Sequence, residues 1–169
     1  MIFNDSLKFG LGGERIVAEI MRARGWTVVQ VGGQHGEYQG PRIELPMGLT
    51  LVSPDLIIMK NGKTFWIEVK RKSVFSFHKN SQKITTGIDL DKWIDYLEAD
   101  RYGSFPLWLF FLHESDTVRD APDGIARPKT GIYFGQARKL KQTELHRHRN
   151  FGSHGGVFWD IATLGFLPT

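Results

Sequence analysis

Residues 54–72, PDLIIMKNGKTFWIEVKRK, consist of two apolar runs separated by Asn61-Gly62. Asn-Gly between apolar runs is the strongest short signal for a β-hairpin with a two-residue turn. Such a turn also fixes the strand register, because the residues on either side of it must pair outward one by one. This register places Asp55 opposite Glu68. The sequence therefore predicts an antiparallel pair of strands with two acids side by side at its open end.

The charges in this hairpin are unusual because they interrupt apolar strands, where unpaired charge is costly. Cross-strand partners point to the same face of a sheet, and so does Lys70, two residues beyond Glu68. Two adjacent carboxylates repel each other, and a divalent cation removes that repulsion. Oxygen ligands of this kind suit Mg²⁺ or Mn²⁺. A neighbouring lysine can position or deprotonate a water, so the set favours metal-assisted hydrolysis of a phosphodiester.

A simpler interpretation is that Asp55 only begins a strand and that Glu68 and Lys70 form a solvated ion pair. Three features argue against it: the Pro-Asp pair before the hairpin, the matched register, and the apolar residues Ile67 and Val69 on either side of the charges.

The remaining patterns indicate an α/β fold. An apolar stripe predicts a helix over 13–26, with Gly25 as its stop signal, and Asp89 is expected to cap a second helix. The continuous apolar run 106–113 is typical of a strand buried on both faces. The other expected segments are a strand at 27–31, a long loop at 32–53 with room for a short hairpin, a mobile connection at 73–87, a helix at 89–99 and a strand at 131–137. A hairpin followed by a strand–helix–strand crossover predicts a mixed central β-sheet flanked by helices.

The pattern Pro54-Asp55 … Glu68-Val69-Lys70 resembles the PD-(D/E)XK nuclease superfamily. Within it, the chain is similar to archaeal-type Holliday-junction resolvases, which share Gly10, Glu14-Arg15 and Gly25-Trp26 of its opening helix. The resemblance covers about residues 10–72. It implies a restriction-endonuclease-like αβββαβ core at about 10–113, within a single domain of residues 1–169. The basic extension at about 114–169 has no counterpart in those resolvases, and the loop 32–53 is longer than theirs.

The superfamily adds a glutamate from the first helix to its active site, and two residues qualify. Glu14 lies roughly 90° from the centre of the helix's apolar face, whereas Glu19 lies roughly 130° away, toward solvent. A side chain at the seam of the face can reach the sheet edge, so Glu14 is the predicted site residue.

The resemblance implies that Glu14, Asp55 and Glu68 hold Mg²⁺, for which Mn²⁺ substitutes, together with the backbone carbonyl of Val69. Lys70 then orients or activates the attacking water. The implied substrate is branched DNA such as a four-way junction, cut by a homodimer. Two alternatives stay open at this point. The chain is a restriction-like or phage replication and repair nuclease acting on other DNA, or a DNA-binding module of the same fold without catalysis. A protein-interaction domain would show no salt-dependent DNA binding.

The net charge is +4 and the pI about 9.4, which suits a polyanionic partner. Basic residues follow the catalytic strand and gather in the C-terminal segment, where we expect phosphate contacts with salt-dependent affinity. The candidate DNA-binding residues are Arg71, Lys72, Arg138, Lys139, Lys141, Arg147 and Arg149.

The absence of cysteine excludes a disulfide framework and thiolate zinc sites, and it suits the reducing cytoplasm of a bacterial, archaeal or phage-infected cell. No run of 18 apolar residues occurs, so no membrane partner is expected. The start of the chain has no apolar region typical of a signal peptide.

Histidines occur in two settings. The alternation His146-Arg147-His148-Arg149 suggests a metal site, but the arginines would repel a cation and no acids accompany it, so a zinc site is not predicted there. His35 and Tyr38 in the long loop, and His78 in the connection after the hairpin, are expected at the surface, where they can touch DNA.

Overall fold

The computed structural model describes residues 3–31, 42–45, 48, 50–149 and 154–169. His35 and Tyr38 lie outside these residues. The elements are α1 (Phe3–Ala23), β1 (Thr27–Gln30), β2 (Arg42–Glu44), β3 (Thr50–Val52), β4 (Leu56–Lys60), β5 (Lys63–Lys72), β6 (Phe75–His78), β7 (Lys83–Asp89), α2 (Leu90–Tyr102), β8 (Leu107–His113), β9 (Val118–Arg119), β10 (Gly131–Gln136), α3 (Ala137–Gln142), β11 (His146–His148), β12 (Gly156–Asp160), the 3₁₀ helix η1 (Ile161–Thr163) and β13 (Gly165–Leu167).

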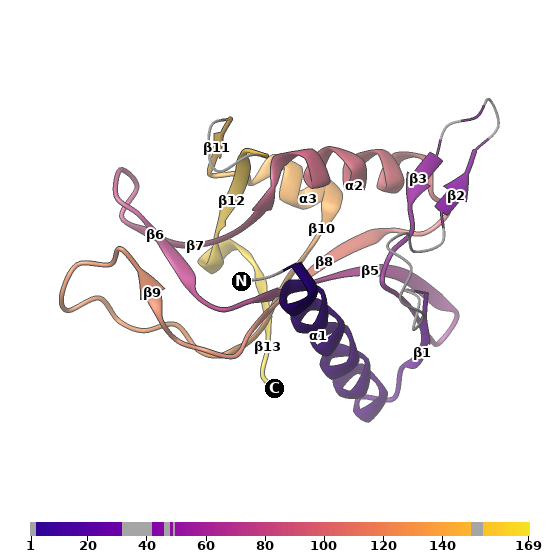
Figure 1. The fold of residues 1–169 in the computed structure, drawn as a ribbon. Coiled ribbons are helices and arrows are strands. Elements are labelled where there is room, and N and C mark those ends of the chain that lie inside the picture. The colour runs from indigo at the N-terminus through magenta and orange to yellow at the C-terminus, as the bar shows by residue number, and fades with distance from the viewer. Residues whose placement is uncertain (1–2, 32–41, 46–47, 49, 150–153) are drawn as a thin grey trace.

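The main sheet has six strands in the order β1-β4-β5-β8-β10-β13 (Figure 1). Strands β4 and β5 are antiparallel, whereas β5 and β8 are parallel and are linked through α2. The predicted mixed sheet is therefore confirmed, and so is the order of helix, three strands, helix and strand in the core, formed by α1, β1, β4, β5, α2 and β8. Strand β8 is buried along almost its whole length, as its continuous apolar run predicted.

The register of the hairpin β4–β5 is the predicted one: Leu56 pairs with Ile67, Ile57 with Trp66, Ile58 with Phe65, Met59 with Thr64 and Lys60 with Lys63. Asn61 and Gly62 have φ values of 50° and 73°. Positive φ at both central residues is the mark of the type I′ turn that Asn-Gly favours. Local sequence therefore determines which residues of β4 and β5 face each other.

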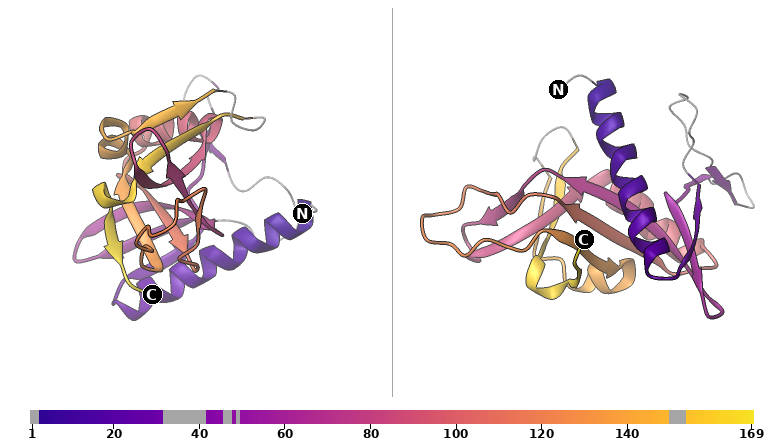
Figure 2. Two further views of the ribbon diagram at one scale, coloured as in Figure 1. Left: turned by 90° about the vertical axis from the view of Figure 1, so that its left-hand side faces the viewer. Right: turned by 90° about the horizontal axis from the view of Figure 1, so that it is seen from below.

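Two apolar layers lie on opposite faces of the main sheet, and Figure 2 shows α1 on one side and α2 and α3 on the other. On the first face, Val17, Ala18 and Met21 of α1 pack against Ile67 and Val69 of β5. On the second face, α2, α3 and the second sheet cover the strands, and the buried residues include Trp66, Trp93, Tyr96, Phe111 and Trp159. Strand β5 lies between the two layers.

Helix α1 starts at Phe3, ten residues before the predicted start at 13. The glycines at 10, 12 and 13 therefore lie inside the helix and do not precede it. Gly13 is where α1 approaches β5, because a Cβ there would lie 2.8 Å from the Cβ of Arg71. The predicted end is right: Gly25 has a φ of 77°, and Trp26 N–H donates to the Met21 carbonyl at 3.1 Å, as in a Schellman motif.

The connection predicted as mobile at 73–87 is wrong, because it forms β6 and most of β7. Phe75 and Phe77 are buried while Ser76 and His78 are half-buried, which is the period-two pattern of a strand. These strands belong to a second sheet, in the order β11-β12-β7-β6-β9. The short hairpin allowed for in the long loop is β2–β3. Asp89 precedes α2, as predicted, but its side chain makes no capping hydrogen bond.

The C-terminal segment 114–169 is built into both sheets. Strands β10 and β13 extend the main sheet beyond β8, and β9, β11 and β12 pair within the second sheet. Residues 114–169 therefore supply core side chains such as Tyr133, Leu140 and Trp159.

Candidate active site

The site lies where β5 continues past the start of its neighbour β4. The ladder between them ends at the pair Leu56–Ile67, so the next residues of β5 have no β4 partner. Asp55, which precedes β4, covers this end of the ladder by accepting a hydrogen bond from Val69 N–H at 2.7 Å. The side chain of Val69 is buried against α1. The chain thereby brings the carboxylate of Asp55 to the part of β5 that carries Glu68.

Glu68 is a buried acid with two partners on one of its oxygens. Its side chain is 5% exposed. The Lys70 ammonium and the Tyr96 hydroxyl both donate to Glu68 Oε1, at 2.7 and 2.5 Å. The Lys70 ammonium also lies 5.2 Å from the centre of the Tyr96 ring. The other oxygen, Glu68 Oε2, is buried and makes no hydrogen bond to any described residue.

The electrostatics show that Glu14 and Asp55 belong to the same cluster. Burial, and then the charge of Glu68, raise the pKa of Glu14. The same two causes raise the pKa of Asp55 well above its ordinary value, and Lys70 only partly opposes them. Burial and mutual repulsion therefore make both carboxyl groups harder to ionise than isolated ones.

Lys70 is the cation of the cluster. Burial alone would lower the pKa of Lys70, but the charge of Glu68, the hydrogen bond to Glu68 and the charge of Asp55 raise it well above its ordinary value. The side chain therefore stays protonated at neutral pH. A protonated ammonium can hold a water or a phosphate oxygen by hydrogen bonds, but it cannot remove a proton from water.

The two candidate helix acids are placed differently. Glu14 is half-buried and feels the charges of Glu68 and Lys70. The Glu19 side chain is 65% exposed and lies 4.0 Å from Arg15, one turn away on the same helix. Because α1 packs closely on β5 at Gly13, the next residue is carried toward the acids of the sheet.

The buried oxygens fit a hard divalent cation. A carboxylate oxygen that is buried without a hydrogen-bond donor is costly unless a cation or ordered water satisfies it. Glu68 Oε2 is such an atom, and the charges of Asp55 and Glu14 act on the same cluster, although the carboxylate oxygens of the three acids do not all lie within 4.8 Å of one another. A cluster made of oxygens alone, without imidazole or thiolate, is the donor set that Mg²⁺ and Mn²⁺ prefer.

Tyr96 is the site residue that the sequence does not reveal. It lies on α2 in the same apolar stripe as Trp93, so its spacing marks it only as a core residue. Its hydroxyl nevertheless reaches Glu68 across 28 residues of sequence. Burial and the Glu68 charge raise the pKa of Tyr96 well above its usual value, so it remains a hydrogen-bond donor to the acid.

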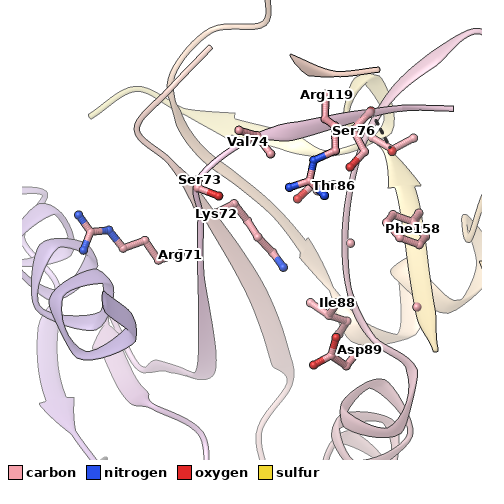
Figure 3. A pocket seen from close by; sticks show the side chains of 13 residues that line it. Arg71, Lys72, Ser73, Val74, Ser76, Thr86, Ile88, Asp89, Arg119 and Phe158 are labelled. Carbon is pink, nitrogen blue, oxygen red and sulfur yellow. Dashed lines mark hydrogen bonds between the residues drawn. The ribbon is translucent and has the colours of Figure 1, made fainter. Parts of the chain in front are cut away.

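A cavity of about 340 Å³ opens beside the end of β5 (Figure 3). Figure 3 shows the Lys72 amine and the Arg119 guanidinium pointing into it, with Asp89 at the far end and Arg71 turned away toward α1. Burial and the nearby charge of Lys70 lower the pKa of Lys72 to about 8. The cavity therefore presents positive charge on the same face of β5 as Glu68 and Lys70.

The other predicted DNA-binding residues lie on several elements. Arg71 pairs with Glu114, Arg138 with Asp100 at 2.8 Å, and Arg147 with Glu144 at 2.5 Å. Lys139 and Lys141 are exposed on α3, and Arg149 is exposed just after β11. The positive charge that acts on Glu14 and Asp55 is instead that of Lys70.

No helix among the described residues is long and apolar enough to cross a membrane.

No protein-family model and no curated protein matches this sequence. Among solved structures, the chain is similar to Hjc, a Holliday junction resolvase from the archaeal hyperthermophile Archaeoglobus fulgidus. The two share 12% sequence identity with a TM-score of 0.48, and the match covers 89% of this chain and 88% of that chain.

Proposed function

We propose that this protein is a divalent-metal-dependent endonuclease that hydrolyses phosphodiester bonds in DNA, with branched DNA as its preferred substrate. The observation that carries the proposal is Glu68 Oε2, a buried carboxylate oxygen without a hydrogen-bond donor among the described residues. It lies in a cluster with Asp55, Glu14 and the protonated Lys70. A protein that only binds DNA gains nothing from carboxylates placed where phosphates must approach.

The carboxylates of Glu14, Asp55 and Glu68 would hold the metal, with the backbone carbonyl of Val69 as a further ligand. When bound, Mg²⁺ supplies an activated water and neutralises charge on the phosphate oxygens. Mn²⁺ is expected to substitute because it takes the same oxygen ligands.

Lys70 orients the attacking water and stabilises the charge that develops on the phosphate. An ammonium group has three N–H donors, and one of them reaches Glu68 Oε1. The raised pKa keeps the group charged throughout the pH range in which the carboxylates bind metal. Tyr96 donates to the same oxygen of Glu68, so it acts as a positioning residue.

The cavity beside β5 supports a path for the DNA backbone. Lys72, two residues along β5 from Lys70, and Arg119 of β9 both point into it. A phosphate there would be held by charge, with an affinity that falls as salt rises. The exposed Lys139, Lys141 and Arg149 would add contacts at a distance from the scissile bond. The preference for junctions, and a homodimer that makes two symmetric cuts, follow from the resemblance to junction resolvases.

The test compares a labelled four-way junction, a linear duplex of matched sequence and single-stranded DNA, each with Mg²⁺, Mn²⁺ or chelator. The variants are Glu68→Gln and, as a matched control, Glu19→Gln, which changes an exposed acid on α1. We expect paired cuts in the junction with either metal, lost in Glu68→Gln and kept in Glu19→Gln. Cutting of every substrate would remove junction selectivity and favour the restriction-like or repair nuclease. Binding without cleavage under any metal would overturn the proposal in favour of a DNA-binding module.

A further inference from the structure

Three histidines from separate parts of the chain meet at the edge of the second sheet. His78 ends β6, and His146 and His148 lie on β11. One ring nitrogen from each lies within 4.8 Å of the others. Neither the carboxylate site nor the proposed DNA path uses these residues. The cluster unites residues that are 68 positions apart in the sequence, which is why the alternation on β11 alone did not predict it.

Packing holds the rings in place. Alternation along β11 puts His146 and His148 on one face of the strand and Arg147 on the other. The His146 ring stacks on Phe158 of β12, with centroids 4.7 Å apart, and on His78, with centroids 3.8 Å apart. The His148 ring lies edge-on to His146, with centroids 4.9 Å apart.

The hydrogen bonding of two of the rings leaves a nitrogen available for a metal. The Nδ1 atom of His78 lies 2.7 Å from the Ser81 hydroxyl, a contact that leaves Nε2 as the outward-facing nitrogen. The Nδ1 atom of His146 is buried and has no hydrogen-bond partner among the described residues. Neutral imidazole with an unpartnered nitrogen is the form that binds transition metals.

Of the two arginines that argued against a cation at this place in the sequence, Arg147 is paired with an acid in the structure and Arg149 is exposed just after β11. Arg147 is engaged by Glu144 through two hydrogen bonds, of 2.5 and 2.8 Å. Lys83, the cross-strand partner of His78, lies with its ammonium 3.3 Å from Asp160 Oδ2. Acids therefore balance the two positive side chains that lie next to the histidines on these strands.

We propose that His78, His146 and His148 form a binding site for a borderline transition-metal dication, of which Zn²⁺ is the best fit. Three imidazoles leave a fourth tetrahedral position for water. Zinc–nitrogen bonds are about 2.0–2.1 Å long, and the three ring nitrogens lie within 4.8 Å of one another, so small movements of the rings would complete the coordination on binding. The metal would then cross-link the β6–β7 hairpin to β11. Its nitrogen donors distinguish it from the oxygen site on β5.

The test uses tag-free protein stripped with chelator, with millimolar Mg²⁺ present to occupy the carboxylate site. Zn²⁺ is titrated against a chromophoric chelator, and Co²⁺ binding is followed by its visible absorption. The variants are His146→Phe, which keeps the aromatic stacking, and His148→Ala, which changes an exposed side chain. The matched control is His154→Ala, an exposed histidine paired with Asp91 at 3.1 Å. Far-UV circular dichroism checks that each variant is folded.

We expect one equivalent of Zn²⁺, a tetrahedral Co²⁺ spectrum and a Zn²⁺-dependent rise in melting temperature. Outer-shell changes around a metal cost about 10–100-fold in affinity, so loss of a ligand should weaken binding by about 100-fold or more in both site variants. The control should bind like the wild type. Wild-type protein that binds no Zn²⁺ under these conditions, or site variants that bind as tightly as the control, would overturn the proposal. Neither result depends on DNA cleavage, so the assignment stands or falls separately from the nuclease.

Discussion

Replacing Asp55 by Asn is expected to stabilise the metal-free protein and to remove its response to Mg²⁺. Asparagine has nearly the same shape, and its carbonyl oxygen can still accept the hydrogen bond from Val69 N–H. The substitution therefore mainly deletes one negative charge from a cluster that includes Glu68 and Glu14.

The magnitude follows from the geometry of the hairpin. Asp55 and Glu68 come directly after the last pair of the ladder, Leu56–Ile67, and the Cβ atoms of facing residues on neighbouring strands lie about 5 Å apart. At an effective dielectric constant of about 20, two like charges at that distance repel by about 3 kcal/mol. Lys70 offsets part of this repulsion, so we expect a net gain of about 1–2 kcal/mol in the unfolding free energy. For a chain of this size that raises the melting temperature by about 2–8 °C.

The effect depends on pH with a definite sign. The folded-state pKa of Asp55 is raised above its ordinary 3.8, so the folded protein binds a proton that the unfolded chain has released. The stability of the wild type is therefore lost as pH rises through the folded pKa of Asp55. The advantage of Asp55→Asn should be small near about pH 4 and grow toward alkaline pH.

The assay is thermal unfolding followed by circular dichroism, in chelator and in Mg²⁺, for wild type and Asp55→Asn. At about 100 times its dissociation constant, Mg²⁺ stabilises the wild type by about 2.7 kcal/mol and should stabilise the variant far less. Asp116→Asn is the control, because Asp116 forms a surface ion pair with Arg127. A variant that melts below the wild type in chelator at alkaline pH and still responds fully to Mg²⁺ would refute the electrostatic account of the site.

Three further predictions concern other parts of the molecule. Gly13→Ala should lower the unfolding free energy, measured with urea, by about 1–3 kcal/mol, because the new Cβ would lie 2.8 Å from the Cβ of Arg71. Gly10 has open space around it, so Gly10→Ala should raise the unfolding free energy by up to about 1 kcal/mol through its higher helix propensity. Tyr96→Phe should leave the fold intact and lower the rate of DNA cleavage about tenfold or more at saturating Mg²⁺, because a hydrogen bond to a charged group contributes about 1.5–3 kcal/mol. An unchanged rate would show that Tyr96 does not position Glu68. Burial and the Lys72 charge lower the pKa of His113 to about 3, so below about pH 6.5 the unfolded chain binds a proton that the folded protein does not bind. The unfolding free energy should therefore fall by about 1.4 kcal/mol per pH unit below about pH 6.5, and His113→Gln should reduce that slope.

Much of the candidate site could be predicted from the sequence because it is built from local rules. An Asn-Gly turn sets the register of β4 and β5, strand alternation puts Glu68 and Lys70 on one face of β5, and Asp55 lies just beyond the end of the ladder, where it accepts from Val69 N–H. Helical periodicity singled out Glu14 over Glu19, and the structure has the first half-buried near Glu68 and the second exposed. Both predictions depend only on residues that are close in sequence or that face each other across a single turn.

The segments that sequence reasoning missed depend on partners far along the chain. The stretch 73–87 has weak periodicity by itself, yet it forms strands because β12 and β9 pair with them. In the sequence, Gly13 marks the start of the predicted helix, whereas in the structure it lies inside α1, where it packs against Arg71. A pattern of residue types does not carry this information, because the stabilising contact is supplied by another part of the chain.

The sequence by itself determined the hairpin, its register and the acids and lysine that it gathers, because a two-residue turn and strand alternation leave them no other arrangement. The tertiary structure alone decided that Tyr96 reaches Glu68, that Lys72 and Arg119 share a cavity, and that His78 meets His146 and His148. The physical reason is sequence distance. Contacts between residues tens of positions apart arise only when sheets and helices pack, since burial of their apolar faces fixes which side chains meet.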